Sequence, residues 1–234
     1  MSMEPYAALI LFSGIAELDT TCGPQILVSE PIVTCTVLGL LFGNPALGLL
    51  LGILFQFLCL GYLPLGGEQF TDVNMAAFIA TASLFTASRL FGLEGAALHA
   101  AMMPVMIYGV VIGRLGIILR NAERRMNGAR SLKYIEALGA GMPVSPARTH
   151  LAGMATAFCK GVLMTLILVP VGAVLCGIVK YVPDMALKSM AAAPLLVWGA
   201  VSASATGFYW KKGRSLFIVA GSIGGILWML IATQ

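Results

Sequence analysis

Four apolar runs in the second half of the chain approach or exceed the length of a membrane-spanning helix: residues 93–119, 150–179, 186–208 and 215–232. A bilayer core of roughly 30 Å needs about 20 apolar residues per helix. Only 10% of the 234 residues are charged and 59% are hydrophobic, whereas soluble proteins average about 25% charged residues. We therefore expect an all-α, polytopic integral membrane protein that forms one domain over residues 1–234.

The first half of the chain has shorter apolar runs that are interrupted by Gly, Pro or charge: residues 5–18, 31–42, 46–65 and 73–85. Several of these are too short to cross a bilayer as straight helices. Irregular backbone at membrane depth is tolerated only where it is buried in protein or lines a polar cavity, and discontinuous helices are typical of transporters. We therefore predict that residues 1–92 form a broken-helix part, with short or re-entrant helices, that binds the substrate.

Basic residues gather in the middle of the chain, where residues 114–148 contain seven Lys or Arg and two Glu. Cytoplasmic loops collect positive charge, so we expect residues 120–148 to form a basic cytoplasmic loop. Within it, residues 117–126 and 131–138 are predicted to be helical, with a turn at Asn127 and Gly128. Residues 131–138 are interpreted as a helix anchored at the membrane interface, with a partner-docking helix as the alternative. Lys211, Lys212 and Arg214 are expected on the same face.

Polar residues that are not easily explained as loop residues cluster between Asp19 and Asn74. Gln56 lies within an apolar run, where an unpaired amide would cost about 1–3 kcal/mol. It either forms an interhelical hydrogen bond or binds a hydroxyl of a polyhydroxylated ligand. Gln25 and Glu30 lie earlier in the same region.

The segment GYLPLGGEQFTDVNMAA is predicted to be a helix end, a turn rich in Gly and Pro, and the start of a new helix. The turn carries Glu68, Gln69, Asp72 and Asn74. Thr71 or Asp72 could simply cap the following helix, but two carboxylates and two amides beside a membrane segment also suit a polyhydroxylated ligand.

Two GxxxG patterns flank a turn at Gly43, Asn44 and Pro45: Gly39 with Gly43, and Gly48 with Gly52. Small residues at this spacing allow helix backbones to approach closely. The pattern predicts a tightly packed helical hairpin rather than a ligand contact.

Catalytic and metal chemistry have little support in the sequence. His99 and His150 each stand without a neighbouring carboxylate or nucleophile, the five cysteines form no metal or disulfide pattern, and no nucleotide or hydrolase motif is present. Lys160 either extends toward the membrane interface or faces a cavity. We expect no catalytic residue, no metal, no cofactor and no nucleic-acid partner. An intramembrane enzyme using His99, His150 and Asp72 is the remaining enzymatic alternative.

Residues 29–67, SEPIVTCTVLGLLFGNPALGLLLGILFQFLCLGYLPLGG, resemble the IIC membrane subunit of the mannose/fructose/sorbose family of bacterial sugar phosphotransferase systems. The resemblance extends more weakly over nearly the whole chain. Eleven residues fit the family pattern: Asp19, Gln25, Ser29, Pro31, Ile32, Gly39, Gly43, Gly48, Gly52, Gly61 and Asp72. Three depart from it, because Glu30 replaces the usual Arg, Asn44 the usual Asp, and Gln56 the usual Glu.

The resemblance implies a sugar-translocating permease subunit of the bacterial inner membrane, which passes a hexose across that membrane. It implies a IID membrane partner, cytosolic IIB and IIA subunits that relay phosphate, and a homo-oligomer of the IIC–IID unit; this chain itself would carry no phosphohistidine. The residues expected to line the sugar path are Gln25, Gln56, Glu68, Gln69, Asp72 and Asn74. A transport-inactive membrane anchor or regulatory subunit derived from IIC is the alternative, motivated by the three departures.

Overall fold

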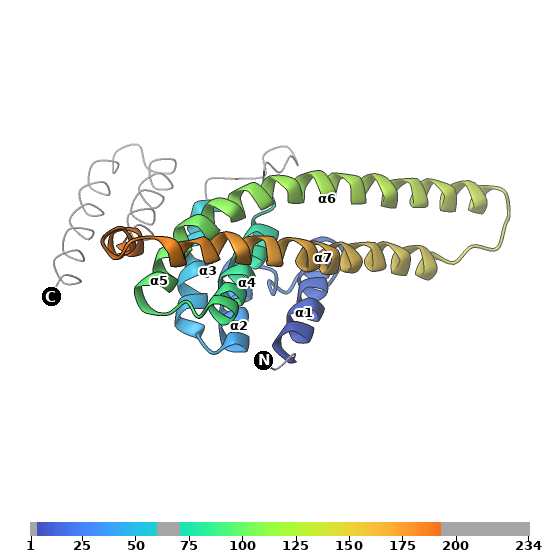
Figure 1. Cartoon of the computed structure of the whole chain (residues 1–234). Helices are drawn as coiled ribbons and strands as arrows, with labels where there is room; N and C mark the ends of the chain where they lie inside the picture. Colours follow the sequence, from blue (N-terminus) through green and yellow to red (C-terminus); the bar gives the residue numbers. More distant parts are fainter. Residues whose placement is uncertain (1–3, 60–70, 193–234) are drawn as a thin grey trace, which may run out of the picture.

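The computed structural model describes residues 4–59 and 71–192, and these are almost entirely helical (Figure 1). The helices are α1 (Glu4–Thr21), α2 (Pro31–Phe42), α3 (Pro45–Cys59), α4 (Val73–Phe91), α5 (Gly95–Ala100), α6 (Met102–Gly139) and α7 (Pro146–Gly177), followed by a 3-10 turn at Ile178–Tyr181. The described residues contain no strand. The all-α expectation is confirmed.

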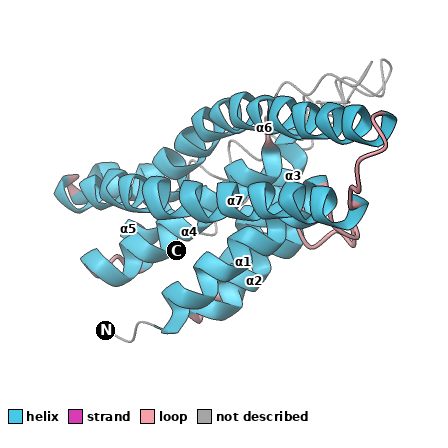
Figure 2. Ribbon diagram, turned by 90° about the vertical axis from the view of Figure 1, so that its right-hand side faces the viewer, coloured by secondary structure: helices cyan, strands magenta, loops and turns pink. Residues whose placement is uncertain are grey.

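The two longest helices, α6 and α7, run antiparallel as a long hairpin closed by residues 140–145 (Figure 1). Their 38 and 32 residues correspond to about 57 and 48 Å at 1.5 Å per residue. Both lengths exceed a bilayer core of roughly 30 Å. The tip of the hairpin projects well beyond the shorter helices, which gather at its other end (Figure 1). Figure 2 shows the molecule from the side of the tip, with the described residues drawn as helices and loops.

The hairpin predicted from the glycine pattern is confirmed. Gly43 has φ of 84° and ends α2, and the side chain of Asn44 caps α3 by accepting from the Leu47 amide at 3.1 Å. Gly48 packs directly on α2, because a Cβ atom at this position would lie 2.8 Å from the Cα of Gly39. Such contact between backbones is possible only for residues without a side chain.

Helix α4 is the central element of the bundle and contacts α2, α3, α6 and α7. Every residue from Met75 to Ala87 is buried, and many of them are Ala, which allows neighbouring helices to approach closely. We expected a short apolar run over residues 73–85, but the helix continues to Phe91. Arg89 does not end it, because its guanidinium lies over the Phe42 ring at 4.9 Å. Gly92, with φ of 65°, is the C-cap.

Three stretches among the described residues are long and apolar enough to cross a membrane: Val73–Phe91, Gly95–Gly139 and Pro146–Tyr181. By contrast, α2 and α3 have 12 and 15 residues, about 18 and 22 Å, and are too short for a straight crossing. Long spans together with short broken helices in the first half are therefore confirmed. The apolar runs beyond residue 192, and the basic residues Lys211, Lys212 and Arg214, lie outside the described residues.

The turn predicted at Asn127 and Gly128 is wrong, because α6 is continuous through both residues to Gly139. Instead of starting a turn, the side-chain oxygen of Asn127 accepts a hydrogen bond from Arg130 one turn later, at 2.8 Å. Arg130 also donates to Ala152 and Thr156 of α7. These contacts hold the helix against α7, and a single Gly within a helix costs only about 1 kcal/mol.

Candidate functional site

The segment between α1 and α2, residues 22–30, is irregular and is held in place by one buried carboxylate. Asp19 is 4% exposed, and its two oxygens accept from the backbone amides of Ile26 at 2.7 Å and Ser29 at 3.0 Å. Gln25 and Leu27 have φ of 52° and 67°, a conformation that non-glycine residues rarely adopt. Asp19 thus fixes a strained connection, of the kind that often occurs at functional sites.

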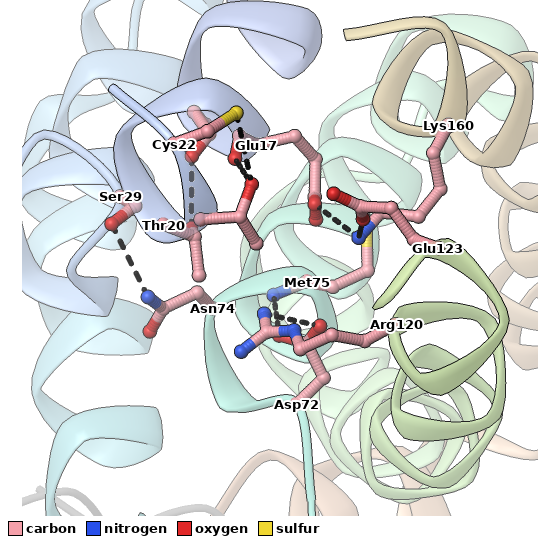
Figure 3. Close-up of polar contacts among 12 residues, drawn as sticks. Glu17, Thr20, Cys22, Ser29, Asp72, Asn74, Met75, Arg120, Glu123 and Lys160 are labelled. Atoms are coloured by element: carbon pink, nitrogen blue, oxygen red, sulfur yellow. Dashed lines mark hydrogen bonds and ion pairs between the residues drawn. The ribbon is translucent and has the colours of Figure 1, made fainter. Parts of the chain in front are cut away.

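Two side-chain hydrogen bonds connect the end of this segment to α3 and α4. The amide of Gln56 donates to Glu30 at 3.0 Å, and the amide of Asn74 donates to the Ser29 hydroxyl at 3.3 Å. Figure 3 shows the second contact. We call Ser29, Glu30, Gln56 and Asn74 the loop cluster. The carbonyl oxygen of Gln56 is buried and has no hydrogen-bond partner among the described residues, which leaves it able to accept from a ligand hydroxyl.

A buried ion pair joins the start of α4 to α6. Arg120 donates to a carboxylate oxygen of Asp72 at 2.5 Å, and the side chains are 6% and 1% exposed. The other oxygen of Asp72 accepts from the Met75 amide at 3.2 Å, as an N-cap, and the Asp72 amide donates to the carbonyl of Gly113. Asp72 therefore combines a capping role with a buried charge contact.

A second set of buried charges ties α1 to the α6–α7 hairpin. The ammonium of Lys160 lies 2.6 Å from Glu17 of α1 and 2.7 Å from Glu123 of α6, and Figure 3 shows it between the two carboxylates. The three side chains are 3–10% exposed. Burying charges is costly unless they are paired, so this arrangement strongly favours one position of α1 against the hairpin. We call Glu17, Glu123 and Lys160 the lysine triad.

Glycines in the long helices make room for these contacts. At Gly161, one residue after Lys160, an added Cβ would lie 2.6 Å from the backbone oxygen of Ser13, and at Gly116 it would lie 2.6 Å from the Cβ of Asp72. Any larger residue would push α1 or the start of α4 away from the hairpin. The charged groups can therefore meet at hydrogen-bonding distance.

The structure brings together two of the six residues expected to line a sugar path. Gln56 and Asn74 belong to the loop cluster, and Gln25 lies on the same connecting segment with an exposed side chain. Asp72 is 2% exposed and contacts Arg120 rather than the cluster. Glu68 and Gln69 lie outside the described residues.

The sequence analysis did not single out Glu17, Arg120 or Glu123 as interacting residues. Arg120 and Glu123 were assigned to the basic loop, and Glu17 falls within the apolar run of residues 5–18. Their spacing could have indicated that both face the same neighbours, because Arg120 and Glu123 are three residues apart and lie on one helix face. Lys160 was expected either to extend toward the membrane interface or to face a cavity; the structure places its ammonium between the carboxylates of Glu17 and Glu123.

In the part of the chain that the structure describes, the two histidines and the acidic residues form no metal site. His99 has a ring nitrogen 2.8 Å from the carbonyl of Gly95 in its own helix, and His150 lies at the start of α7. Within residues 4–59 and 71–192, no three His, Cys, Asp or Glu side chains are placed to hold a metal ion.

Comparison with known proteins identifies the family. The family model described as the sorbose-specific IIC component of the phosphotransferase system (PTS) matches residues 5–209. Two sorbose-specific EIIC components are similar over shorter segments. The protein from Lacticaseibacillus casei is 33% identical over 52 residues, 22% of this chain and 19% of its own length. The protein from Klebsiella pneumoniae is 31% identical over 72 residues, 31% of this chain and 27% of its own length.

The matched segments thus span about a fifth and about a quarter of those two relatives, whereas the family match covers most of the chain, including α1 to α7. It contains the irregular connecting segment, the loop cluster and the buried ion pairs. This chain belongs to the family of sorbose-specific IIC components of the phosphotransferase system.

Proposed function

We propose that this chain is the sugar-translocating IIC permease subunit of a mannose-family phosphotransferase system. It binds a hexose and passes it across the bacterial inner membrane. The observation that carries the proposal is the loop cluster, within a chain whose family match covers residues 5–209. There, irregular backbone, two amides, a hydroxyl and a carboxylate meet between short helices.

The chemistry of the loop cluster suits a sugar. Hexose hydroxyls both donate and accept, and the cluster offers both functions: carboxylate and amide oxygens accept, while amide nitrogens donate. The buried Gln56 oxygen, unpaired among the described residues, supports a direct contact. Gln25 lies on the same segment, and Glu68 and Gln69 precede α4 in the sequence. We propose that Gln25, Gln56, Glu68, Gln69 and Asn74 line the sugar path and that Asp72 positions the start of α4.

The lysine triad and the ion pair of Asp72 with Arg120 support separate roles for two parts of the chain, one that binds the sugar and one that holds the first in place. The short helices of residues 1–92 contribute the sugar-binding part, and the long hairpin of α6 and α7 is the element against which they are held. In this proposal a IID membrane subunit completes the path. IIB receives phosphate from IIA and phosphorylates the sugar at the inner face. The basic end of the hairpin, from Arg120 to Arg148, lies in the cytoplasm, as the positive-inside rule predicts.

The test is sugar uptake coupled to phosphorylation in a transport-negative bacterial strain. The chain is expressed with its genomic IID, IIB and IIA partners, and hexoses and amino sugars are supplied in turn. We expect accumulation of one sugar phosphate that disappears when this chain is omitted. Absence of accumulation, with a well-inserted and partner-bound chain, would instead support the transport-inactive anchor or regulatory subunit.

A further inference from the structure

A small polar pocket lies on the α6–α7 hairpin and shares no lining residue with the loop cluster. Its volume is about 300 Å³, at the lower end of the range for small-molecule sites. Arg130 follows Glu123 by seven residues, which places the pocket about 10 Å further along α6 than the lysine triad. The walls come from three elements: Cys22 just after α1, residues of α6, and the first turns of α7.

The side chains that line this pocket are basic or uncharged. The polar ones on α6 and α7 are Asn127, Arg130, Ser131, Tyr134, Thr149 and His150, and no acidic residue is among the lining residues. The pocket therefore combines a guanidinium and an imidazole with hydroxyl and amide groups. This composition favours an anionic ligand.

The Arg130 guanidinium is fixed in orientation. Its Nη1 donates to Asn127 at 2.8 Å, to Ala152 at 3.2 Å and to Thr156 at 2.6 Å. These bonds all involve one nitrogen, and the guanidinium carries further N–H donors that can bind a second group. An arginine held in place in this way binds an anion without first losing side-chain freedom.

The remaining polar groups complete a site for a phosphate ester of a polar molecule. Among the described residues the His150 ring makes no hydrogen bond and is exposed, so it is available as a donor. The hydroxyls of Ser131 and Tyr134 can also donate to phosphate oxygens. Asn127 uses its oxygen for Arg130, which leaves its amide nitrogen for a ligand hydroxyl.

We propose that this pocket binds a hexose phosphate, with the phosphate at Arg130 and His150 and the sugar toward Asn127 and Tyr134. The choice of a sugar phosphate rests on the proposed function, since it is the product formed at the inner face. Inorganic phosphate shares the same charge chemistry and is the competing source of the anion. The pocket would hold the product, or sense it, on the basic half of the hairpin.

Binding is tested on the purified full-length chain in lipid nanodiscs by titration calorimetry. Glucose 6-phosphate and fructose 1-phosphate are compared with inorganic phosphate and unphosphorylated glucose. We expect saturable binding of at least one sugar phosphate, tighter than binding of inorganic phosphate by about tenfold or more. In Ser131→Glu, where a carboxylate is placed in the pocket, this affinity should fall at least about tenfold. His150→Gln should weaken it in the same direction.

The matched control is Ala129→Glu, which adds the same charge at an exposed position of α6 that does not line the pocket. It should retain sugar phosphate binding, and all three variants should retain the binding of the transported sugar. The proposal is overturned if no sugar phosphate binds, if inorganic phosphate binds as tightly as the esters, or if Ser131→Glu and Ala129→Glu behave alike.

These results are distinct from those of the uptake test. Uptake without sugar phosphate binding rejects the pocket and leaves the transporter assignment intact. Sugar phosphate binding that Ser131→Glu removes, in a chain that supports no uptake, rejects the transporter assignment and leaves the pocket.

Discussion

The amide of Gln56 donates a hydrogen bond of 3.0 Å to the carboxylate of Glu30, which joins the end of α3 to the residue before α2. At both positions the resemblance described above implies other residues, Arg at position 30 and Glu at position 56. The two departures are therefore in direct contact. With Arg at position 30 and Glu at position 56, the donor would be at 30 and the acceptor at 56. In this chain the roles are reversed, because Glu30 accepts and Gln56 donates.

Replacing Gln56 with Leu is expected to remove sugar-dependent stabilisation and leave membrane insertion unchanged. The substitution deletes the amide that contacts Glu30 and the buried oxygen available to a ligand. We expect a loss of about tenfold in sugar affinity, since a buried hydroxyl of the sugar left without its acceptor costs about 1–3 kcal/mol. The measurement is the sugar-induced shift of the thermal midpoint. Ile53→Leu, at a half-buried position of α3, is the control, and unchanged sugar binding in Gln56→Leu would contradict the assignment.

Restoring the family residues at both positions should show strong coupling between them. Gln56→Glu alone places two carboxylates at hydrogen-bonding distance and should destabilise the chain. The double variant Glu30→Arg with Gln56→Glu replaces this repulsion with an ion pair and should recover the loss. We expect an interaction free energy of about 1–3 kcal/mol in a double-mutant cycle of unfolding in mild detergent. Additive effects would show that the two side chains do not act together.

The backbone organisation was largely predictable from the sequence. Apolar runs and glycine spacing indicated a helical membrane protein, and the α2–α3 hairpin turned at Gly43 as the pattern predicted. Such features depend on residues that are close in sequence. The turn at Asn127 and Gly128 was predicted on the same local grounds and was wrong, because Arg130 holds that part of α6 against α7. Contacts between distant segments override local propensity there.

The charged contacts of the site were less predictable. Lys160 is separated from Glu17 by 143 positions and from Glu123 by 37, and no local pattern pairs them. Gln56 was recognised as needing a polar partner, but its partner Glu30 was visible only in the fold. The sequence thus revealed which buried polar groups needed explanation, and the packing of α1 and α3 determined how they are satisfied.

Lys160→Met should strongly destabilise the chain, because it leaves Glu17 and Glu123 buried without a cation. Breaking a buried pair by removing one partner costs about 3–5 kcal/mol. Adding Glu17→Gln removes one of the two unpaired charges and should recover part of the loss. The measurement is the thermal midpoint of the detergent-solubilised protein. Lys188→Met, which removes a lysine without a salt bridge among the described residues, is the control, and equal effects of the two lysine variants would contradict the role of the triad.

Asp72→Asn should separate the charge contact of Asp72 from its capping role. Asn caps helices about as well as Asp, so the Met75 contact is retained while Arg120 loses its carboxylate. We expect destabilisation of about 3–5 kcal/mol, with a further loss of about 1 kcal/mol in Asp72→Ala. Unfolding in mild detergent is compared with that of Asp184→Asn, which removes an exposed carboxylate. If Asp72→Asn lowered the free energy of unfolding as little as this control, the buried pair would contribute little to holding α4 against α6.

The same substitution, Gly to Ala, should have opposite effects at Gly48 and Gly128. At Gly48 the new methyl group would collide with the backbone of Cys35 and Gly39, and overpacking of this kind costs about 1–3 kcal/mol. At Gly128 nothing lies within 4 Å of the added Cβ, and Ala favours a helix interior by about 1 kcal/mol over Gly. Thermal midpoints of both variants are compared with the unmodified chain. A destabilised Gly128→Ala would indicate a turn at this position in place of the continuous α6, and a neutral Gly48→Ala would contradict the close packing of α2 on α3.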